Sequence, residues 1–146
     1  MMKHFLVAIF LAFVVSCSQQ TSEQHLAAAK THINNNDLQA ASIELKNAIK
    51  LSPQSAEARF LLGKVYIHQK EYQGAEKELN KALELKHPAS EVVPLLSQAY
   101  QKTQSDVALL ELSHNDKGFS VEQSAQVALY KVQACLDCSK MNKRKR

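Results

Sequence analysis

The sequence predicts an all-α protein of stacked helical hairpins, and three observations support that prediction. Ala, Leu, Glu, Lys and Gln dominate the 146 residues, while Gly and Pro number only three each, a composition that favours helices. No alternating run of β-branched residues is long enough to argue for a sheet. The segment "ASIELKNAIKLSPQ" from Ala41 returns thirty-four residues later as "AEKELNKALELKHP" from Ala75. Such a period indicates repeated units that stack into a solenoid.

The chain begins with a targeting segment. Lys3 precedes eleven uncharged apolar residues, Phe5 to Val15, a stretch too short to span a membrane but typical of a secretory signal. "VVSC", ending at Cys17, resembles the lipobox of bacterial lipoproteins. That resemblance implies a signal peptide over 1–16 and a diacylglycerol on the Cys17 thiol. An ordinary signal peptide or a core helix is the alternative.

Lipidation of Cys17 would make residues 17–21 a tether to the membrane. Two or more acyl chains anchor a protein stably, whereas one chain anchors it only marginally. Ser18 follows the Cys. By resemblance to the sorting rule of enteric bacteria, this residue implies the outer membrane, with the protein facing the periplasm.

Residues 22–55 form the first predicted helix pair. Thr21 and Gln24 have the spacing of a capping box, and "NNND" at 34–37 breaks the helix they open. Ser52-Pro53 ends the second helix, because the residue before Pro resists the α region. The apolar residues of the two helices recur at spacings of three and four: Leu26, Ala29 and Ile33, then Leu38, Ala41, Leu45, Ala48 and Ile49.

Residues 56–89 repeat this plan. "KEYQG" turns the chain, and His87-Pro88 closes the unit. Ala recurs at 41 and 75, and again at 48 and 82, where the two helices of a pair must cross and a methyl group lets them approach closely. The apolar stripes of this unit are Ala58, Leu61, Leu62, Val65 and Tyr66, then Tyr72, Ala75, Leu79, Ala82, Leu83 and Leu85.

The C-terminal third departs from the period. Residues 90–112 form a degenerate third copy whose second helix is short. Residues 113–138 are predicted to hold the first helix of an incomplete repeat, opened by a capping box at Ser120–Gln123, and 139–146 a disordered basic tail. The apolar residues of that helix share one face: Val121, Ala125, Ala128, Leu129, Val132 and Leu136.

These motifs resemble the tetratricopeptide repeat (TPR). Ala41, Leu45, Ala48 and Pro53 stand at the small, large, small and Pro places of the family's second helix, and Leu62-Gly63 with Tyr66 stands at its first-helix motif. The resemblance implies a right-handed α-solenoid. A generic bundle of helical hairpins is the alternative. Residues 1–112 are also similar to the TPR lipoproteins of exosortase/PEP-CTERM systems, which implies a role near exopolysaccharide export.

The charge excludes a nucleic-acid-binding face. The net charge is +4, but Lys3 and five basic residues within 140–146 account for six positive charges, which leaves −2 on the body. A basic tail is usually a solvated segment. Contact of the tail with acidic lipid headgroups or an anionic glycan is the alternative.

No catalytic constellation is apparent, so the chain is predicted to be a non-enzyme without cofactor or metal. Cys135 and Cys138 form a CxxC, which without a thioredoxin-like strand and helix is a weak redox signal. In an oxidising compartment the pair is expected to form a local disulfide, with free thiols as the alternative. Of the histidines, His25 and His32 lie about 10 Å apart along a helix and cannot share a zinc ion unaided.

The predicted function is protein binding in a concave groove. By resemblance to TPR proteins, five places of each first helix point into this groove. Phe60 and Ile67 are expected to receive apolar side chains, and Lys30 and Lys64 to bind carboxylates. The carboxylate clamp of the chaperone-binding subfamily is not reproduced, since Leu26 and Phe60 occupy the place of its Lys. The groove residues are Glu23, Leu26, Lys30, Ile33 and Asn34, then Glu57, Phe60, Lys64, Ile67 and His68, then Glu91, Pro94, Gln98, Gln101 and Lys102.

The sequence therefore predicts a membrane-anchored interaction scaffold that binds a protein or peptide. Three alternatives stay open: a solvated face in place of the groove, a redox or metal protein that uses Cys135 and Cys138, and a truncated fragment without independent function.

Overall fold

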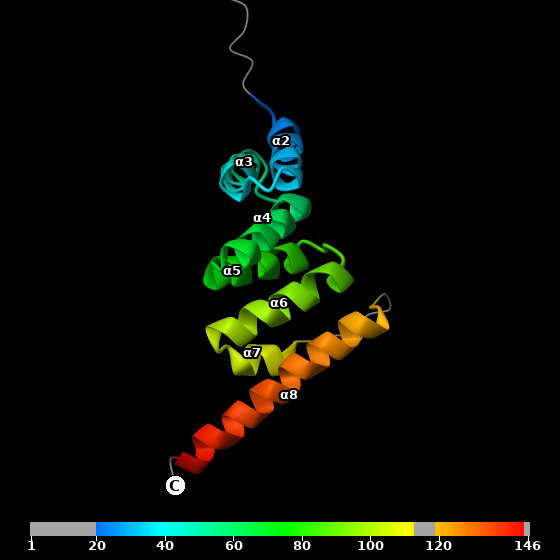
Figure 1. The fold of residues 1–146 in the computed structure, drawn as a ribbon. Coiled ribbons are helices and arrows are strands. Elements are labelled where there is room, and N and C mark those ends of the chain that lie inside the picture. Colours follow the sequence, from blue (N-terminus) through cyan, green and yellow to red (C-terminus); the bar gives the residue numbers. More distant parts are fainter. Residues whose placement is uncertain (1–19, 113–118, 145–146) are drawn as a thin grey trace, which may run out of the picture.

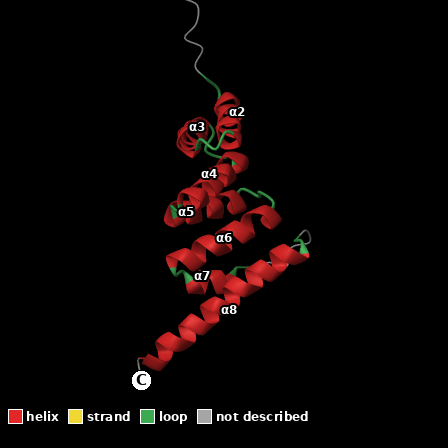
Figure 2. Cartoon of the chain, in the orientation of Figure 1, coloured by secondary structure: helices red, strands yellow, loops and turns green. Residues whose placement is uncertain are grey.

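Every regular element of the described chain is a helix (Figure 2). The computed structural model describes residues 20–112 and 119–144, with the side chains of Cys138 and of residues 141–144 outside that description. The helices form hairpins that stack one on the next (Figure 1), so the predicted all-α TPR solenoid is confirmed. They are α2 (Ser22–Asn34), α3 (Leu38–Leu51), α4 (Ala56–Gln69), α5 (Tyr72–Glu84), α6 (Ala89–Thr103), α7 (Asp106–Glu111) and α8 (Val121–Arg144).

Side chains cap the helix starts where the sequence predicts them. The Thr21 amide donates to Gln24 Oε1 at 2.8 Å, and the Gln24 amide donates back to Thr21 Oγ1 at 3.3 Å. Ser120 and Gln123 exchange the same pair of bonds at 2.8 and 3.1 Å. Both capping boxes are thus confirmed, and each satisfies amides that a helix start leaves unpaired.

The turns between paired helices repeat with the sequence period. Asn36, Lys70 and Gln104, thirty-four residues apart, have φ values of 58°, 63° and 59°. The amide of the next residue donates to the carbonyl five residues earlier in all three turns, at 2.9 Å each. The third pair therefore keeps the turn of the other two, although its sequence has faded.

The predicted crossing residues are buried in both repeats. Ala41, Ala48, Ala75 and Ala82 are each fully buried, as close approach of paired helices requires. In the third pair Leu109 stands at the place of Ala41 and Ala75 and is also fully buried. A Leu at a crossing holds helix axes apart, which is consistent with the shortness of α7.

The core consists of two adjoining clusters. The first lies between α2, α3 and α4 around Leu45, and the second runs from α4 to α8 around Leu79 and Leu96. Leu61 and Tyr66 border both clusters. Continuity between the clusters makes the repeats one packed array, as expected for units that cannot bury their apolar stripes alone.

Helix α8 differs from its prediction in length and orientation. It continues through Arg144, so the predicted disordered tail is wrong from residue 139 to 144. The residues of α8 that face the solenoid are Val127 and Ala134, at 0% and 2% exposure. The apolar face that the sequence singled out is turned to solvent, because it lies on the opposite side of the helix.

Two polar contacts attach α8 to the third pair. Pro94 has no N–H to donate to the Ser90 carbonyl four residues earlier, and Gln123 Nε2 donates to that carbonyl at 2.9 Å. Lys131 Nζ donates to the Leu112 carbonyl at 2.6 Å, where α7 has ended and a cation is favoured.

The predicted signal peptide and Cys17 lie outside the described residues. Among helices α2 to α8, none combines the length and the apolar character that crossing a bilayer requires.

Candidate binding groove

The first helices of the three pairs, α2, α4 and α6, carry the predicted groove residues. Their side chains differ widely in exposure. Phe60 and Ile67 are only 8% exposed, and Leu26, Ile33, Pro94, Gln98 and Gln101 are half-buried. The exposed ones are Glu23, Lys30, Asn34, Glu57, Lys64, His68, Glu91 and Lys102.

Phe60 does not offer an open apolar face to a ligand. The His87 ring stacks on it with centroids 4.2 Å apart and planes inclined by 18°. The His87 side chain is 12% exposed and approaches Glu91 Oε2 at 3.4 Å. Phe60 and Ile67 both belong to the buried core, and their expected contact with a ligand stays a prediction.

The positive charges of the groove are not equivalent. Lys30 Nζ on α2 lies 2.6 Å from Glu57 Oε1 on α4, with both side chains about half exposed. This ion pair satisfies Lys30 within the chain. Lys64, His68 and Lys102 form no ion pair among the described residues. Positive charge available to a ligand therefore lies over α4 and α6.

A repeated polar contact braces each of the first two hairpins. His25 Nδ1 lies 2.6 Å from Glu44 Oε2, and Arg59 Nη1 lies 2.6 Å from Glu78 Oε2. Arg59 and Glu78 each stand thirty-four residues after their counterparts in the first hairpin. The Arg59 and Glu78 side chains are only 16% and 10% exposed. In the third pair Val93 and Leu112 stand at these places, so an apolar pair replaces the charges.

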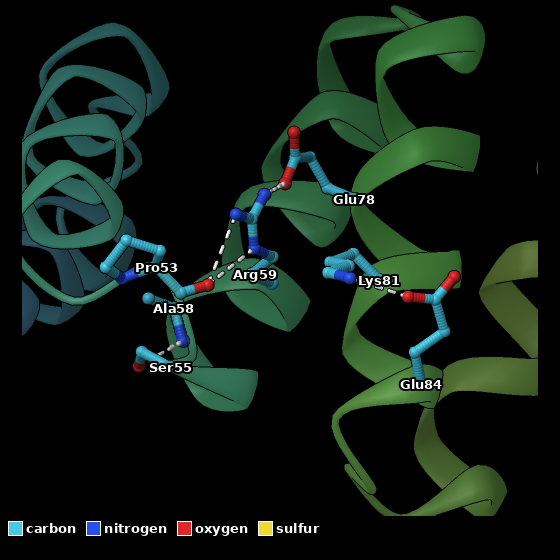
Figure 3. Close-up of polar contacts among 7 residues, drawn as sticks. All are labelled: Pro53, Ser55, Ala58, Arg59, Glu78, Lys81 and Glu84. Atoms are coloured by element: carbon cyan, nitrogen blue, oxygen red, sulfur yellow. Dashed lines mark hydrogen bonds and ion pairs between the residues drawn. The ribbon is translucent and has the colours of Figure 1, made fainter.

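Arg59 also fixes the loop between the first two repeats. Its Nε and Nη2 donate to the Pro53 carbonyl at 3.3 and 3.2 Å, while Nη1 reaches Glu78 (Figure 3). One guanidinium thus joins the inter-repeat loop, α4 and α5. Sequence reasoning missed this contact, although the coincidence of Glu44 with Glu78 at the repeat period was a visible signal.

Tyr100 joins α6 to α5. Its hydroxyl donates to Asn80 Oδ1 at 3.0 Å. Burial raises the pKa of Tyr100, the bond to Asn80 opposes that rise, and the negative charge of Glu76 adds to it. The hydroxyl therefore remains a neutral donor well above neutral pH.

A surface hollow of about 560 Å³ lies beside the groove, between the turns of the second and third pairs. Lys102 belongs to both the groove and the hollow. The lining is mostly polar: Lys70, Glu71, Tyr72, Gln73, Gly74, Lys102, Thr103 and Gln104. The hollow extends the cationic surface of Lys102 beyond the first helices.

The CxxC pair is only partly described. Cys135 is a free, exposed thiol, whereas the Cys138 side chain lies outside the description, so the expected disulfide stays a prediction. The residues that the structure describes contain no group of three His, Cys, Asp or Glu side chains arranged to hold a metal ion.

Comparison with known families agrees with the geometry. Residues 26–90 match the family model of the tetratricopeptide repeat, a segment that runs from α2 to the start of α6. Residues 26–90 thus carry the sequence pattern of this repeat, and the fold of the described chain is that of an all-α TPR solenoid. Such repeats generally mediate protein–protein interaction. Among curated proteins, no significant relative was found.

Proposed function

We propose that this chain is a non-enzymatic scaffold whose groove binds an extended protein segment that carries carboxylates. The observation behind the proposal is the cationic surface of Lys64 and Lys102, two exposed side chains without an ion partner in the described chain, with the exposed imidazole of His68 one turn after Lys64 on α4. Lys30 does not contribute, because Glu57 neutralises it. Complementary charge gives such a surface specificity and a fast association rate.

Peptide selection tests this binding function. Phage-displayed random peptides selected against the full chain in detergent micelles are expected to be enriched in Asp and Glu. Lys64→Glu/Lys102→Glu is expected to weaken the best peptide about tenfold, which is about 1.4 kcal/mol. Fluorescence polarisation of the labelled peptide measures the change.

The matched control is Lys50→Glu/Lys77→Glu, which changes the charge equally on the second helices α3 and α5, where both side chains are exposed. This variant is expected to bind the peptide as the wild type does. Equal weakening in both variants, or a selection without acidic enrichment, would contradict an acidic ligand in the groove.

We further propose that Cys17 is lipidated and anchors the chain in the outer membrane, facing the periplasm. Support comes from the basic start, the short apolar stretch and the lipobox-like "VVSC". In a Gram-negative host, labelled palmitate is expected to enter the wild-type protein and not Cys17→Ala. Equal labelling of the two would end the lipoprotein proposal.

We also propose that the scaffold is associated with exopolysaccharide or exosortase-type export. It rests on the similarity of residues 1–112 to the TPR lipoproteins of those systems. A gene neighbourhood with an exosortase would support it, and one with a pilus system would assign the scaffold to another assembly.

A further inference from the structure

Helix α8 is apolar on two opposite sides. Val127 and Ala134 are buried against the solenoid, whereas Leu129, Val132 and Leu136 are 69%, 59% and 51% exposed. Ala125, Leu129, Val132 and Leu136 follow one another at intervals of four, three and four, the spacing of a helix-pairing seam. Val121, 89% exposed, extends this surface towards the start of the helix. These five residues are called the α8 strip.

We propose that the α8 strip is a homodimer surface that packs antiparallel on the same strip of a second copy. A contiguous exposed apolar surface marks an interaction site more often than scattered single residues do. A second α8 brings an equivalent apolar helix face that can cover the strip.

The charges at the two ends of the strip favour an antiparallel pair. Glu122 and Lys140 border the same side of the strip, eighteen residues apart, which is about 27 Å along a helix. An antiparallel pair places Glu122 of each chain beside Lys140 of the second copy, where Lys140 Nζ also keeps its largely exposed contact with Asp137 Oδ1 of its own chain at 3.4 Å. A parallel pair would place each of these charges on the opposite flank of the interface from its own copy, so neither Glu122 nor Lys140 would gain an opposite partner from the other.

The side chains of the strip match in this arrangement. With the two-fold axis between Leu129 and Val132, these two residues meet across the axis, and the small Ala125 faces the larger Leu136. Gln126 and Gln133, both exposed, border the strip on the side of Glu122 and Lys140. The result is an apolar centre with a polar rim, as in protein interfaces generally.

The other end of the solenoid does not offer an alternative partner surface. The exposed residues of α2 are almost all polar, and Ala27 is the apolar exception: Glu23, Gln24, Ala27, Lys30, Thr31 and Asn34. A head-to-tail filament would require α2 to cover the α8 strip. A self-complementary strip instead closes a two-fold dimer.

The size of the strip sets the expected affinity. From Val121 to Leu136 the strip is about 22 Å long and one helix wide. The area it can bury is therefore less than the roughly 800 Å² per partner of a standard stable interface. A dissociation constant on the order of micromolar is therefore expected.

Co-capture of two tagged full chains tests self-association. Copies with different tags are co-expressed, and one tag is used for purification. Leu129→Glu/Leu136→Glu is expected to lower co-capture at least tenfold, while helicity by circular dichroism stays unchanged because both side chains are exposed. The matched control Ile43→Glu/Val107→Glu changes two apolar residues that are 57% and 68% exposed on α3 and α7, and it is expected to retain co-capture. Equal co-capture by both variants overturns the proposal.

Cysteine cross-linking tests the antiparallel register. In a Cys135→Ser/Cys138→Ser background, Leu129→Cys is expected to cross-link to itself, and Ala125→Cys to Leu136→Cys on a second copy but not to itself. Self-cross-linking of Ala125→Cys would establish a parallel pair and overturn the register. Cross-links no stronger than those of the background or of Lys77→Cys, or only to a protein of another mass, would overturn the homodimer.

Discussion

Replacing Leu79 with Ala is expected to lower the free energy of unfolding by about 3–5 kcal/mol. Leu79 is fully buried on α5 and belongs to the larger core cluster. It occupies space that exists only because residue 63 is Gly. A Cβ at Gly63 would lie 2.6 Å from Leu79 Cγ and 2.8 Å from Cδ2, so the isobutyl group fits directly against the α4 backbone. Its removal leaves a cavity that rigid helices cannot close.

Urea unfolding followed by circular dichroism measures this loss. Ile43→Ala, at a side chain 57% exposed on α3, is the control and is expected to change stability by less than about 0.5 kcal/mol. A loss below about 1 kcal/mol for Leu79→Ala would contradict close packing of α4 on α5.

A double-mutant cycle locates the effect. Gly63→Ala alone is expected to destabilise the protein by about 1–3 kcal/mol because its methyl group overlaps Leu79. In the Leu79→Ala background the same methyl enters the cavity, and it is expected to recover part of the lost stability. Additive effects of the two changes would show that the side chains do not share this space.

The repeated pairs were predictable from sequence because their signals are local and periodic. Ala41 and Ala75 stand at crossings where only a small side chain fits, and capping boxes such as Thr21 with Gln24 satisfy amides three residues away. Both features act within one hairpin and can be read from spacing alone. The family resemblance then supplied the way in which the hairpins stack.

The groove was less predictable because its character depends on contacts between repeats. The sequence predicts that Phe60 is a ligand-binding aromatic residue, but in the structure His87, from the following loop, stacks on it. The sequence likewise predicts that Lys30 binds a carboxylate of the ligand, but in the structure it pairs with Glu57 of α4. These partners lie twenty-seven residues apart, a separation that no helical spacing relates.

Helix α8 shows a different limit of sequence reasoning. Periodicity identified its widest apolar face, but either face of a helix can pack against a solenoid. Val127 and Ala134 face the third pair, where Gln123 meets the Ser90 carbonyl that Pro94 leaves unpaired. The orientation of α8 therefore follows from polar contacts at its start and middle, which hydrophobic periodicity does not detect.

The second large effect is expected for Glu78→Ala, which should cost about 3 kcal/mol of unfolding free energy. The change leaves the Arg59 guanidinium, 16% exposed, with the Pro53 carbonyl as its remaining partner among the residues drawn in Figure 3. A largely buried cation that loses its carboxylate keeps its desolvation cost without the compensating attraction. Thermal and urea unfolding at neutral pH measure the change.

Two further variants separate this effect from simple loss of a side chain. Arg59→Met/Glu78→Ala removes both charges and is expected to be more stable than Glu78→Ala alone, because no unpaired guanidinium remains. Glu57→Ala breaks the half-exposed pair with Lys30 and is expected to cost less than about 1 kcal/mol, since water screens that pair. If Glu78→Ala costs no more than Glu57→Ala, the Arg59–Glu78 contact is not the brace between the inter-repeat loop and α5, and apolar packing alone would hold the second hairpin against the first.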